Sequence, residues 1–254
     1  MGNNKVHIIE TARLDKETKN QVQRLWQDCR EKEPVTQEPF LDGEENAATG
    51  LPCFYLCYEG ERLTSFLSLF IPDGGYAEGY GFTGPQDRRK GYFSSLVRRA
   101  EVLTQEADIP LYLVSDRQSR DACAFIRRMG LEKVWEERMM EIPAGELYRL
   151  TVDYDPDAFH LSREEDWWIM QNGGKELGRC RLSDFQTAVY LYDFAIDEGQ
   201  RRKGYGRLFL KLLGGLLDEE QVVLLQVGTY NAPACRLYEG CGFTVRESLS
   251  YYQL

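Results

Sequence analysis

Apolar and polar positions follow two periods along the first part of the chain, one typical of strands and one typical of helices. Alternating or continuous apolar runs predict strands at 54–59, 62–71, 78–83, 111–114 and 133–142. Apolar residues three and four apart predict helices at 16–33, 92–107 and 120–129. The segment 34–50, rich in Glu, Pro and Gly, is expected to be a surface loop or a lid.

The second part of the chain shows the same two periods. Strands are predicted at 167–171, 176–182, 187–196 and 222–225, and helices at 205–217 and 233–239. Asn172-Gly173-Gly174 separates the first two of these strands and predicts a tight hairpin. Gly242 follows the last helix, as is typical of a helix end. The pattern therefore predicts a mixed α/β protein.

A pentapeptide repeats between the two parts. Arg88-Arg89-Lys90-Gly91-Tyr92 recurs as Arg201-Arg202-Lys203-Gly204-Tyr205, and each copy lies between a predicted strand and a predicted helix. A second strand and a second helix follow in both cases. A period of this kind indicates two copies of one structural unit.

Length agrees with two units, because 254 residues exceed the usual single core of about 100–150 residues. Pro143-Ala144-Gly145 is predicted to be a linker. We therefore expect an N-terminal domain at 1–145 and a C-terminal domain at 146–254. The stretch 147–163 leaves little room for helices at the start of the second domain.

Composition excludes several classes of protein. The formal net charge of −10 is shared equally by the two parts, so neither is a basic surface for nucleic acid. The seven cysteines form no CxxC pair and there are only two histidines, which argues against a disulfide framework or a zinc site. No apolar run is long enough to span a membrane, and the polar start lacks a signal-peptide core. A cytoplasmic protein is expected.

The repeated basic loop has a chemical use. A glycine-containing loop that leads from a strand into a helix directs unpaired backbone N–H groups and the helix dipole at an anion such as a pyrophosphate. In the second copy, Arg201, Arg202 and Lys203 add positive charge for further phosphates. A solvated basic turn at a helix start is the alternative.

At these residues the chain resembles the GNAT superfamily of N-acetyltransferases. The acetyl-CoA motif of that family reads Gln/Arg-x-x-Gly-x-Gly/Ala, and Arg201–Gly206 fits each fixed position. A second family motif has an Asn after the fifth strand and then Leu-Tyr-x-x-x-Gly-Phe, which Asn231 and the segment 237–243 match. The resemblance covers 187–243 and implies a mixed sheet that is splayed open between its fourth and fifth strands.

The first copy departs from the family pattern. Phe93 stands where the motif has Gly or Ala, and Ile126 and Ser119 replace the Tyr and the Asn of the second motif. The resemblance therefore implies two tandem GNAT-like acyl-CoA N-acyltransferase domains, of which the N-terminal copy is degenerate. A further alternative is that both loops bind CoA and the N-terminal copy is catalytic; Phe93 and Ile126 argue against it.

The resemblance implies an acetyl-CoA-dependent N-acetyltransferase that needs no metal. In this family an amine attacks the acetyl thioester directly within a ternary complex. The backbone of Phe194, Ala195 and Ile196 would polarise the thioester carbonyl, and Tyr238 would protonate the departing thiolate. The cofactor-binding residues implied are these three with Arg201, Arg202, Lys203, Gly204, Tyr205, Gly206 and Asn231. A non-catalytic acyl-CoA-binding or scaffold protein is the alternative function.

The general base and the acceptor depend on weaker signals. Asp193 is the candidate base, and a water positioned by Tyr190 and Tyr192 is the alternative. Because the chain is acidic and the basic loops are expected to be used by phosphates, we expect a cationic acceptor, a small-molecule or peptidic amine. Tyr190, Tyr192 and Trp167 are candidates to hold its ammonium group by cation–π contact. Core packing of these rings is the alternative.

Overall fold

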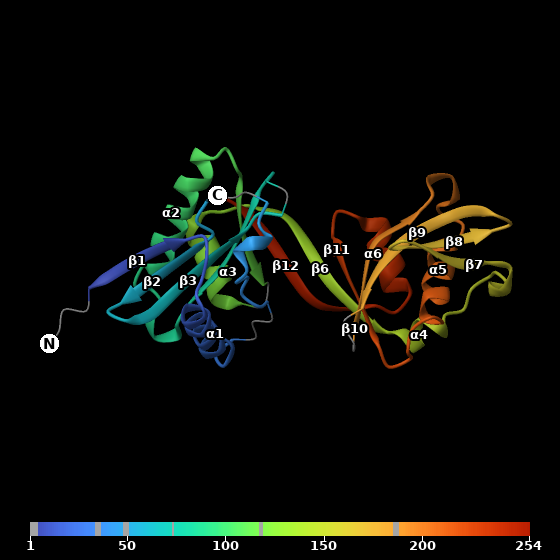
Figure 1. Cartoon of the computed structure of the whole chain (residues 1–254), viewed down its shortest axis with the longest axis horizontal. Coiled ribbons are helices and arrows are strands. Elements are labelled where there is room, and N and C mark those ends of the chain that lie inside the picture. The colour runs from blue at the N-terminus through green and yellow to red at the C-terminus, as the bar shows by residue number, and fades with distance from the viewer. Residues whose placement is uncertain (1–4, 34–36, 48–50, 73, 117–118, 185–187) are drawn as a thin grey trace. The chain divides into compact units, whose positions relative to one another are not determined.

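The structure is a computed structural model that describes residues 5–33, 37–47, 51–72, 74–116, 119–184 and 188–254 (Figure 1). Residue 187 and both ends of the predicted loop 34–50 lie outside these ranges. The chain forms two compact units. Unit 1 contains residues 1–135 and 249–254, and unit 2 contains residues 136–248.

Unit 1 is a sheet covered by three helices. Its own strands are β1 (Val6–Thr11), β2 (Phe54–Glu59), β3 (Arg62–Phe70), β4 (Ala77–Thr83) and β5 (Leu111–Asp116). The first four pair antiparallel in sequence order, and β5 joins β4 in parallel. The helices are α1 (Lys16–Arg30), α2 (Tyr92–Glu106) and α3 (Arg120–Met129). Aromatic and aliphatic side chains from both sheet and helices form one buried core.

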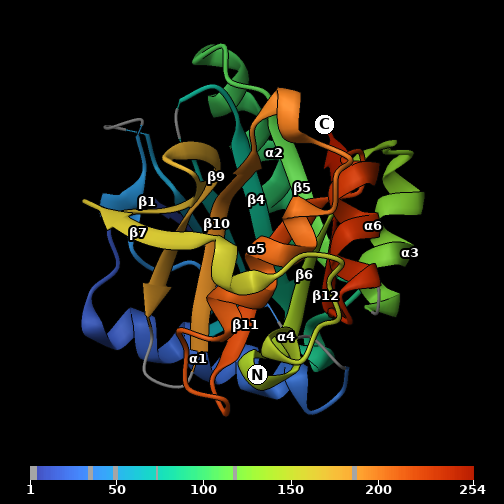
Figure 2. The ribbon, with the colours of Figure 1, turned by 90° about the vertical axis from the view of Figure 1, so that its right-hand side faces the viewer.

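Unit 2 repeats this plan with a shorter helix before the loop. Its strands run in the order β6 (Lys133–Pro143), β11 (Val222–Gly228), β10 (Ala188–Ile196), β9 (Lys175–Asp184), β8 (Trp167–Asn172) and β7 (His160–Glu164). The helices are α4 (Ala144–Tyr148), α5 (Tyr205–Gly214) and α6 (Ala232–Gly240). Helices α5 and α6 lie side by side, so that Leu237 of α6 packs against Gly206 of α5 (Figure 2).

Each unit is completed by a strand from the other part of the chain. Strand β6, which the hydrophobic pattern places at the end of the first domain, pairs with β11 from Glu137 to Pro143. The last five residues of β12 (Thr244–Gln253) pair antiparallel with β5 in unit 1. The compact units therefore differ from two consecutive stretches of sequence. The division at residue 145, which rests on the repeat, remains a prediction.

The predicted linker at 143–145 is wrong. Pro143 ends β6, and Ala144 and Gly145 are buried residues at the start of α4. Their backbone N–H groups donate to Gln221 and Glu219 at 2.9 and 3.2 Å. A β-carbon on Gly145 would lie 3.2 Å from the Glu219 side chain. The small residues at this position thus serve close packing and not flexibility.

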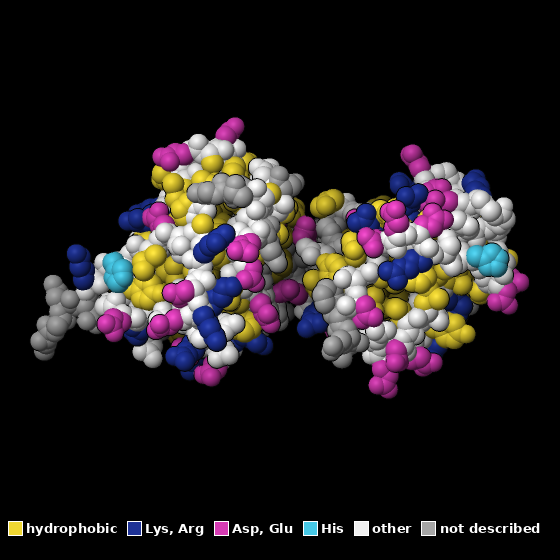
Figure 3. Space-filling view, viewed as in Figure 1, with side chains coloured by type: hydrophobic (Ala, Val, Ile, Leu, Met, Phe, Trp, Pro, Cys, Tyr) yellow, Lys and Arg dark blue, Asp and Glu magenta, His cyan; other side chains and the backbone are white. Residues whose placement is uncertain are grey.

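The predicted hairpin and fold class are confirmed. Strands β8 and β9 are joined at Gly173 and Gly174, whose φ angles of +56° and +78° suit the two central residues of a tight turn. Cys53 and Cys57 are core residues, and all seven cysteines are free thiols. Acidic and basic side chains are interspersed on the visible face of each unit (Figure 3).

None of the helices within the described ranges combines the length and the apolar character needed to cross a bilayer.

Candidate active site

Strands β10 and β11 part halfway along their length. They pair in parallel only from Ala188 to Tyr190 on β10, opposite Val222 to Leu224 on β11. A β-bulge then interrupts β10 between Tyr192 and Ala195, with Asp193 at φ +51°. Beyond the bulge β10 pairs with β9. The backbone of Phe194–Ile196 therefore lies where the sheet opens, which is the position the family resemblance requires for polarising a thioester.

The basic loop follows β10 and leads into α5. A short 3-10 turn (Glu198–Gln200) comes first, and Arg202 and Gly204 then take the left-handed conformation at φ +63° and +85°. Gly204 is the N-cap of α5, and no side chain caps the helix. The first backbone N–H groups of α5 thus have no side-chain acceptor, which is the arrangement that binds anions at helix starts.

Gly206 has a structural role that its motif does not reveal. A β-carbon at this position would lie 2.9 Å from Cδ2 of Leu237. The missing side chain therefore lets α6 pack against the first turn of α5. Packing between the two helices is thus a reason for a small residue at this position of the motif.

The cations of this loop are bonded to neutral acceptors. Nε of Arg201 donates to the Ile196 carbonyl at 3.0 Å. Nζ of Lys203 donates to the Gly199 carbonyl and to Oε1 of Gln200, at 3.0 and 3.1 Å. Both side chains belong to exposed residues, as does Arg202. Their charge therefore remains available at the N-terminus of α5.

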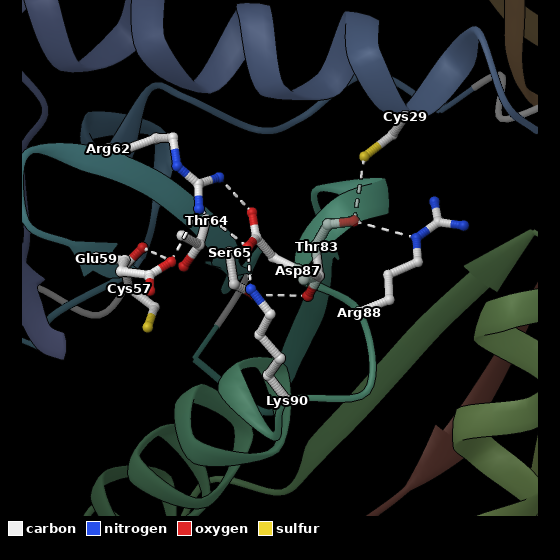
Figure 4. A network of polar contacts seen from close by, with 10 residues as sticks. All are labelled: Cys29, Cys57, Glu59, Arg62, Thr64, Ser65, Thr83, Asp87, Arg88 and Lys90. Carbon is white, nitrogen blue, oxygen red and sulfur yellow. Dashed lines mark hydrogen bonds and ion pairs between the residues drawn. The ribbon is translucent and has the colours of Figure 1, made fainter. Parts of the chain in front are cut away.

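The equivalent loop of unit 1 differs in its charge. Nε of Arg88 donates to the Thr83 carbonyl at 3.3 Å, which repeats the bond from Arg201 to Ile196. However, Nη1 of Arg88 also forms ion pairs with Glu33, at 2.7 Å, and with Asp121. Lys90 pairs with the buried Asp87 at 2.8 Å (Figure 4).

Asp87 also forms a second ion pair. Its carboxylate also accepts from Arg62, and this hydrogen bond, followed by that from Lys90, holds the pKa of Asp87 below its usual value. Two of the three loop cations of unit 1 are thus compensated by carboxylates. The sequence repeat alone does not show this difference, because Glu33 and Arg62 lie outside the motif.

A large and a small residue have exchanged places between the units. Phe93 of α2 lies against Gly81 of β4, where a β-carbon would come within 2.7 Å of the ring, and it packs on Phe125 at 5.0 Å. In unit 2 the repeat aligns Phe194 with Gly81, and Gly206 with Phe93. The aromatic ring thus comes from the helix in one unit and from the strand in the other.

Unit 1 contains a cavity of about 190 Å³ at this position. Its walls are β4, the start of α2, α3 and the inner side of α1, with Trp26, Cys29 and Glu33 among the lining residues. Sequence reasoning missed this cavity, since α1 is far from the motif in the chain. Arg88 lines this cavity and is paired with Glu33, whereas Arg201 of the unit 2 loop bonds to a neutral carbonyl.

Tyr238 lies on α6 in the core of unit 2. Only 7% of the residue is exposed, and its ring packs against Phe194 and Phe243 at centroid distances of 6.2 and 5.5 Å. Burial raises the pKa of Tyr238 above its ordinary value. Within the described part of the chain the hydroxyl has no hydrogen-bond partner. It is therefore a protonated donor at neutral pH whose hydroxyl is unengaged.

Asn231 caps α6, because its Oδ1 accepts from the Ala234 N–H at 3.3 Å. Ser119 caps α3 of unit 1 in the same way, at 3.2 Å from Ala122. The motif asparagine therefore has a structural role that its replacement in unit 1 preserves. Its predicted role in holding the cofactor stays a prediction.

Asp193, the candidate base, has a side chain that is 53% exposed and lies 3.6 Å from Nε of Arg181. Arg181 in turn stands 4.2 Å above the Trp167 ring, and Arg179 lies 5.3 Å from the same ring. Trp167 thus already binds two guanidinium groups. Of the three aromatic residues proposed for an ammonium group, Tyr190 and Tyr192 remain near each other, with ring centroids 6.4 Å apart.

Two further residues near the opening carry no sequence signal. Gln226 of β11 accepts from the Tyr190 hydroxyl at 3.2 Å and donates to Glu137 of β6. Glu137 belongs to a strand predicted for the first domain, so no motif connects it with this site. The described residues bring no three potential metal ligands together.

Comparisons with known proteins agree with this geometry. Residues 133–243 match the model of the Acetyltransferase (GNAT) family. No curated protein matches the chain in sequence.

Solved structures match the fold of the whole chain. A GCN5-related N-acetyltransferase from Sphaerobacter thermophilus aligns with a TM-score of 0.72 at 14% identity, over 98% of this chain and 95% of that one. A tandem GNAT protein from the clavulanic acid biosynthesis pathway aligns with a TM-score of 0.72 at 15% identity, over 98% of both chains. A GNAT-family acetyltransferase from Colwellia psychrerythraea aligns with a TM-score of 0.60 at 11% identity, over 98% and 99%. The whole chain therefore has the fold of a tandem GNAT protein.

Proposed function

From the match of residues 133–243 to the Acetyltransferase (GNAT) family, we propose that unit 2 transfers an acetyl group from acetyl-CoA to a primary amine. The repeat suggests domains at 1–145 and 146–254, of which the second is the active one. A cytoplasmic location, and a cationic small-molecule or peptidic acceptor, are part of this proposal.

One observation carries the choice of unit 2. Its loop presents Arg201, Arg202 and Lys203 beside an uncapped helix start, and the bonds of Arg201 and Lys203 go to neutral acceptors. In unit 1 the equivalent Arg88 and Lys90 are compensated by carboxylates. A pyrophosphate that displaces a carboxylate from an arginine gains less than one that meets an unpaired cation.

The proposed chemistry uses few side chains. The amine nitrogen attacks the thioester carbonyl, whose oxygen is polarised by the backbone N–H groups of Phe194–Ile196. The carbon–sulfur bond then breaks, and Tyr238 gives its proton to the thiolate and regains one from solvent. The proton lost by the amine goes to Asp193 or to water. When bound, acetyl-CoA supplies the activated acetyl group.

Matched variants in the two loops test this proposal. Arg201→Gln with Lys203→Gln should weaken acetyl-CoA binding by at least about tenfold, because each hydrogen bond to a charged group contributes about 1.5–3 kcal/mol. Arg88→Gln with Lys90→Gln changes the same residues of unit 1 and should leave the dissociation constant unchanged. Isothermal titration calorimetry measures both, with thermal unfolding as the check on folding. Loss of binding only in the unit 1 variant would contradict the proposal.

The alternative of a non-catalytic acyl-CoA-binding protein is separated by turnover. A panel of amines is incubated with acetyl-CoA, and the free thiol that is released is measured. Release that depends on both the amine and unit 2 supports a transferase, whereas tight binding without release from any amine supports the alternative.

A further inference from the structure

Three polar side chains form a hydrogen-bonded network across neighbouring strands of unit 2, which we call the polar network. The Tyr190 hydroxyl on β10 donates to Oε1 of Gln226 on β11, at 3.2 Å. Nε2 of Gln226 then donates to the carboxylate of Glu137 on β6. The amide of Gln226 is thus oriented by the tyrosine so that its N–H group holds the carboxylate in place.

The polar network lies where the opening in the sheet begins. Tyr190 belongs to the last pair between β10 and β11, opposite Leu224. Gln226 follows two residues further along β11, and Glu137 of β6 stands opposite Gly228. The three side chains therefore mark the line at which β10 separates from β11.

The side chains of this polar network face away from the helices of unit 2. Leu225 and Val227, the neighbours of Gln226, are buried in the core with Phe209 and Tyr238 of the helices. Side chains alternate between the two faces of a strand, so Gln226 points to the opposite face, where it is exposed. An acceptor that approaches from this face would reach the opening in the sheet from the side opposite α5 and α6.

The chemistry of these residues selects a cation. Glu137 is half-buried, and its negative charge, second to burial, raises the pKa of Tyr190. A carboxylate has about four lone-pair sites and can accept from an ammonium group as well as from Gln226. The rings of Tyr190 and Tyr192 present further negative potential to a cation beside them.

We infer that Glu137 binds the ammonium group of the acceptor, with Tyr190 and Tyr192 beside it and Gln226 as the positioning residue. The bound ammonium group loses one proton to Asp193 or to water before its nitrogen attacks the thioester carbonyl. The acceptor is then a cationic primary amine that enters over the face of the sheet opposite α5 and α6. This inference rests on the proposed transfer of an acetyl group in unit 2. It also makes the site of unit 2 depend on a strand from the first part of the chain.

The test compares two glutamates on one strand. Glu137→Gln should raise KM for the amine on the order of 10- to 100-fold, as expected for the loss of a charged hydrogen-bond partner, with KM for acetyl-CoA unchanged. Glu141→Gln is the matched control, because Glu141 lies four residues along the same strand, on the same face, and pairs with Arg246 at 3.4 Å. It should change neither constant. The probes are spermidine, phenethylamine and lysine methyl ester, with aniline as an acceptor that is uncharged at neutral pH.

The outcomes separate this inference from the function on which it rests. If the wild-type protein releases thiol from none of the amines, the transferase itself is refuted. If it acetylates a cationic amine but Glu137→Gln behaves as Glu141→Gln does, or if aniline is the best acceptor, only the role of Glu137 is refuted. Gln226→Met covers the case in which Glu137→Gln does not fold. It should raise KM for the amine several-fold, and an unchanged KM would count against the inference.

Discussion

At the scale of single residues, Tyr238 has a ring that packs in the core and a hydroxyl that is available to donate a proton. Its ring fills space between Phe194 and Phe243, while its hydroxyl has no partner within the described ranges. Burial raises the pKa of Tyr238, so the phenol is protonated at neutral pH and loses its proton only at higher pH. A proton donor of this kind affects the transition state for thiolate departure much more than the binding of acetyl-CoA.

We therefore expect Tyr238→Phe to lower kcat by about 10²- to 10⁴-fold. The dissociation constant of acetyl-CoA and the melting temperature should hardly change, because phenylalanine keeps the ring contacts. Single-turnover rates measure the chemical step without interference from product release, and calorimetry measures binding. A variant with the wild-type single-turnover rate would show that another group protonates the thiolate.

The motifs predicted residues whose backbone conformation is constrained. They missed residues whose contacts are with segments far away in the sequence. Gly204 could be predicted because a left-handed N-cap requires glycine. Glu137 could not, because its place beside Gln226 depends on how β6 pairs with β11. The compensation of Arg88 by Glu33 was equally hidden, since the carboxylate comes from a segment far away in the chain.

At the scale of elements, the strands and helices that bury a face were predictable and the edge strands were not. The predicted bounds of β2 and α3 agree with the structure, because these elements carry clear apolar periodicity. Strands β1 and β7 have mostly exposed or half-exposed residues, so their sequence shows no regular alternation. The first half of β12 is polar for the same reason.

The exchange of large and small residues between helix and strand gives a prediction at this scale. Gly206→Phe should destabilise the protein by about 1–3 kcal/mol, because the new ring meets Leu237. Phe194→Gly should also destabilise it, by leaving a cavity beside Phe209. Since unit 1 holds glycine on the strand and phenylalanine on the helix, the double variant should lose less than the sum of the two.

Urea unfolding of the four proteins in this double-mutant cycle measures the coupling. Additive losses would show that the two positions do not share one space. Gly199→Ala is a suitable control, because a β-carbon there meets nothing within 4 Å.

At the scale of the whole molecule, the repeat predicted two copies of one fold but not the exchange of their last strands. Two similar units offer similar places for β6 and β12, and a repeat in sequence does not say which unit each strand joins. Tyr251 shows how firmly the exchanged strand is held. It is 2% exposed and stacks on Trp135 at 4.4 Å.

Tyr251→Ala should therefore destabilise unit 1 by about 3 kcal/mol, the usual loss for a buried aromatic side chain. Hydrogen exchange should accelerate at the β5 amides that pair with this strand, and much less in β9 of unit 2. Tyr230→Ala is the control, because that ring is 77% exposed. Equal acceleration in both units, or none in either, would contradict this prediction.

The pairing of β12 with β5 also has a consequence for the order of events during synthesis. A ribosome releases the chain from its N-terminus, and domains usually fold as each one emerges. Here the sheet of unit 1 has a vacant place beside β5 until residues 249–253 have left the exit tunnel. Unit 2, in contrast, consists of residues 136–248, all of which are translated before this segment. The unit that is translated first is therefore the last to be completed.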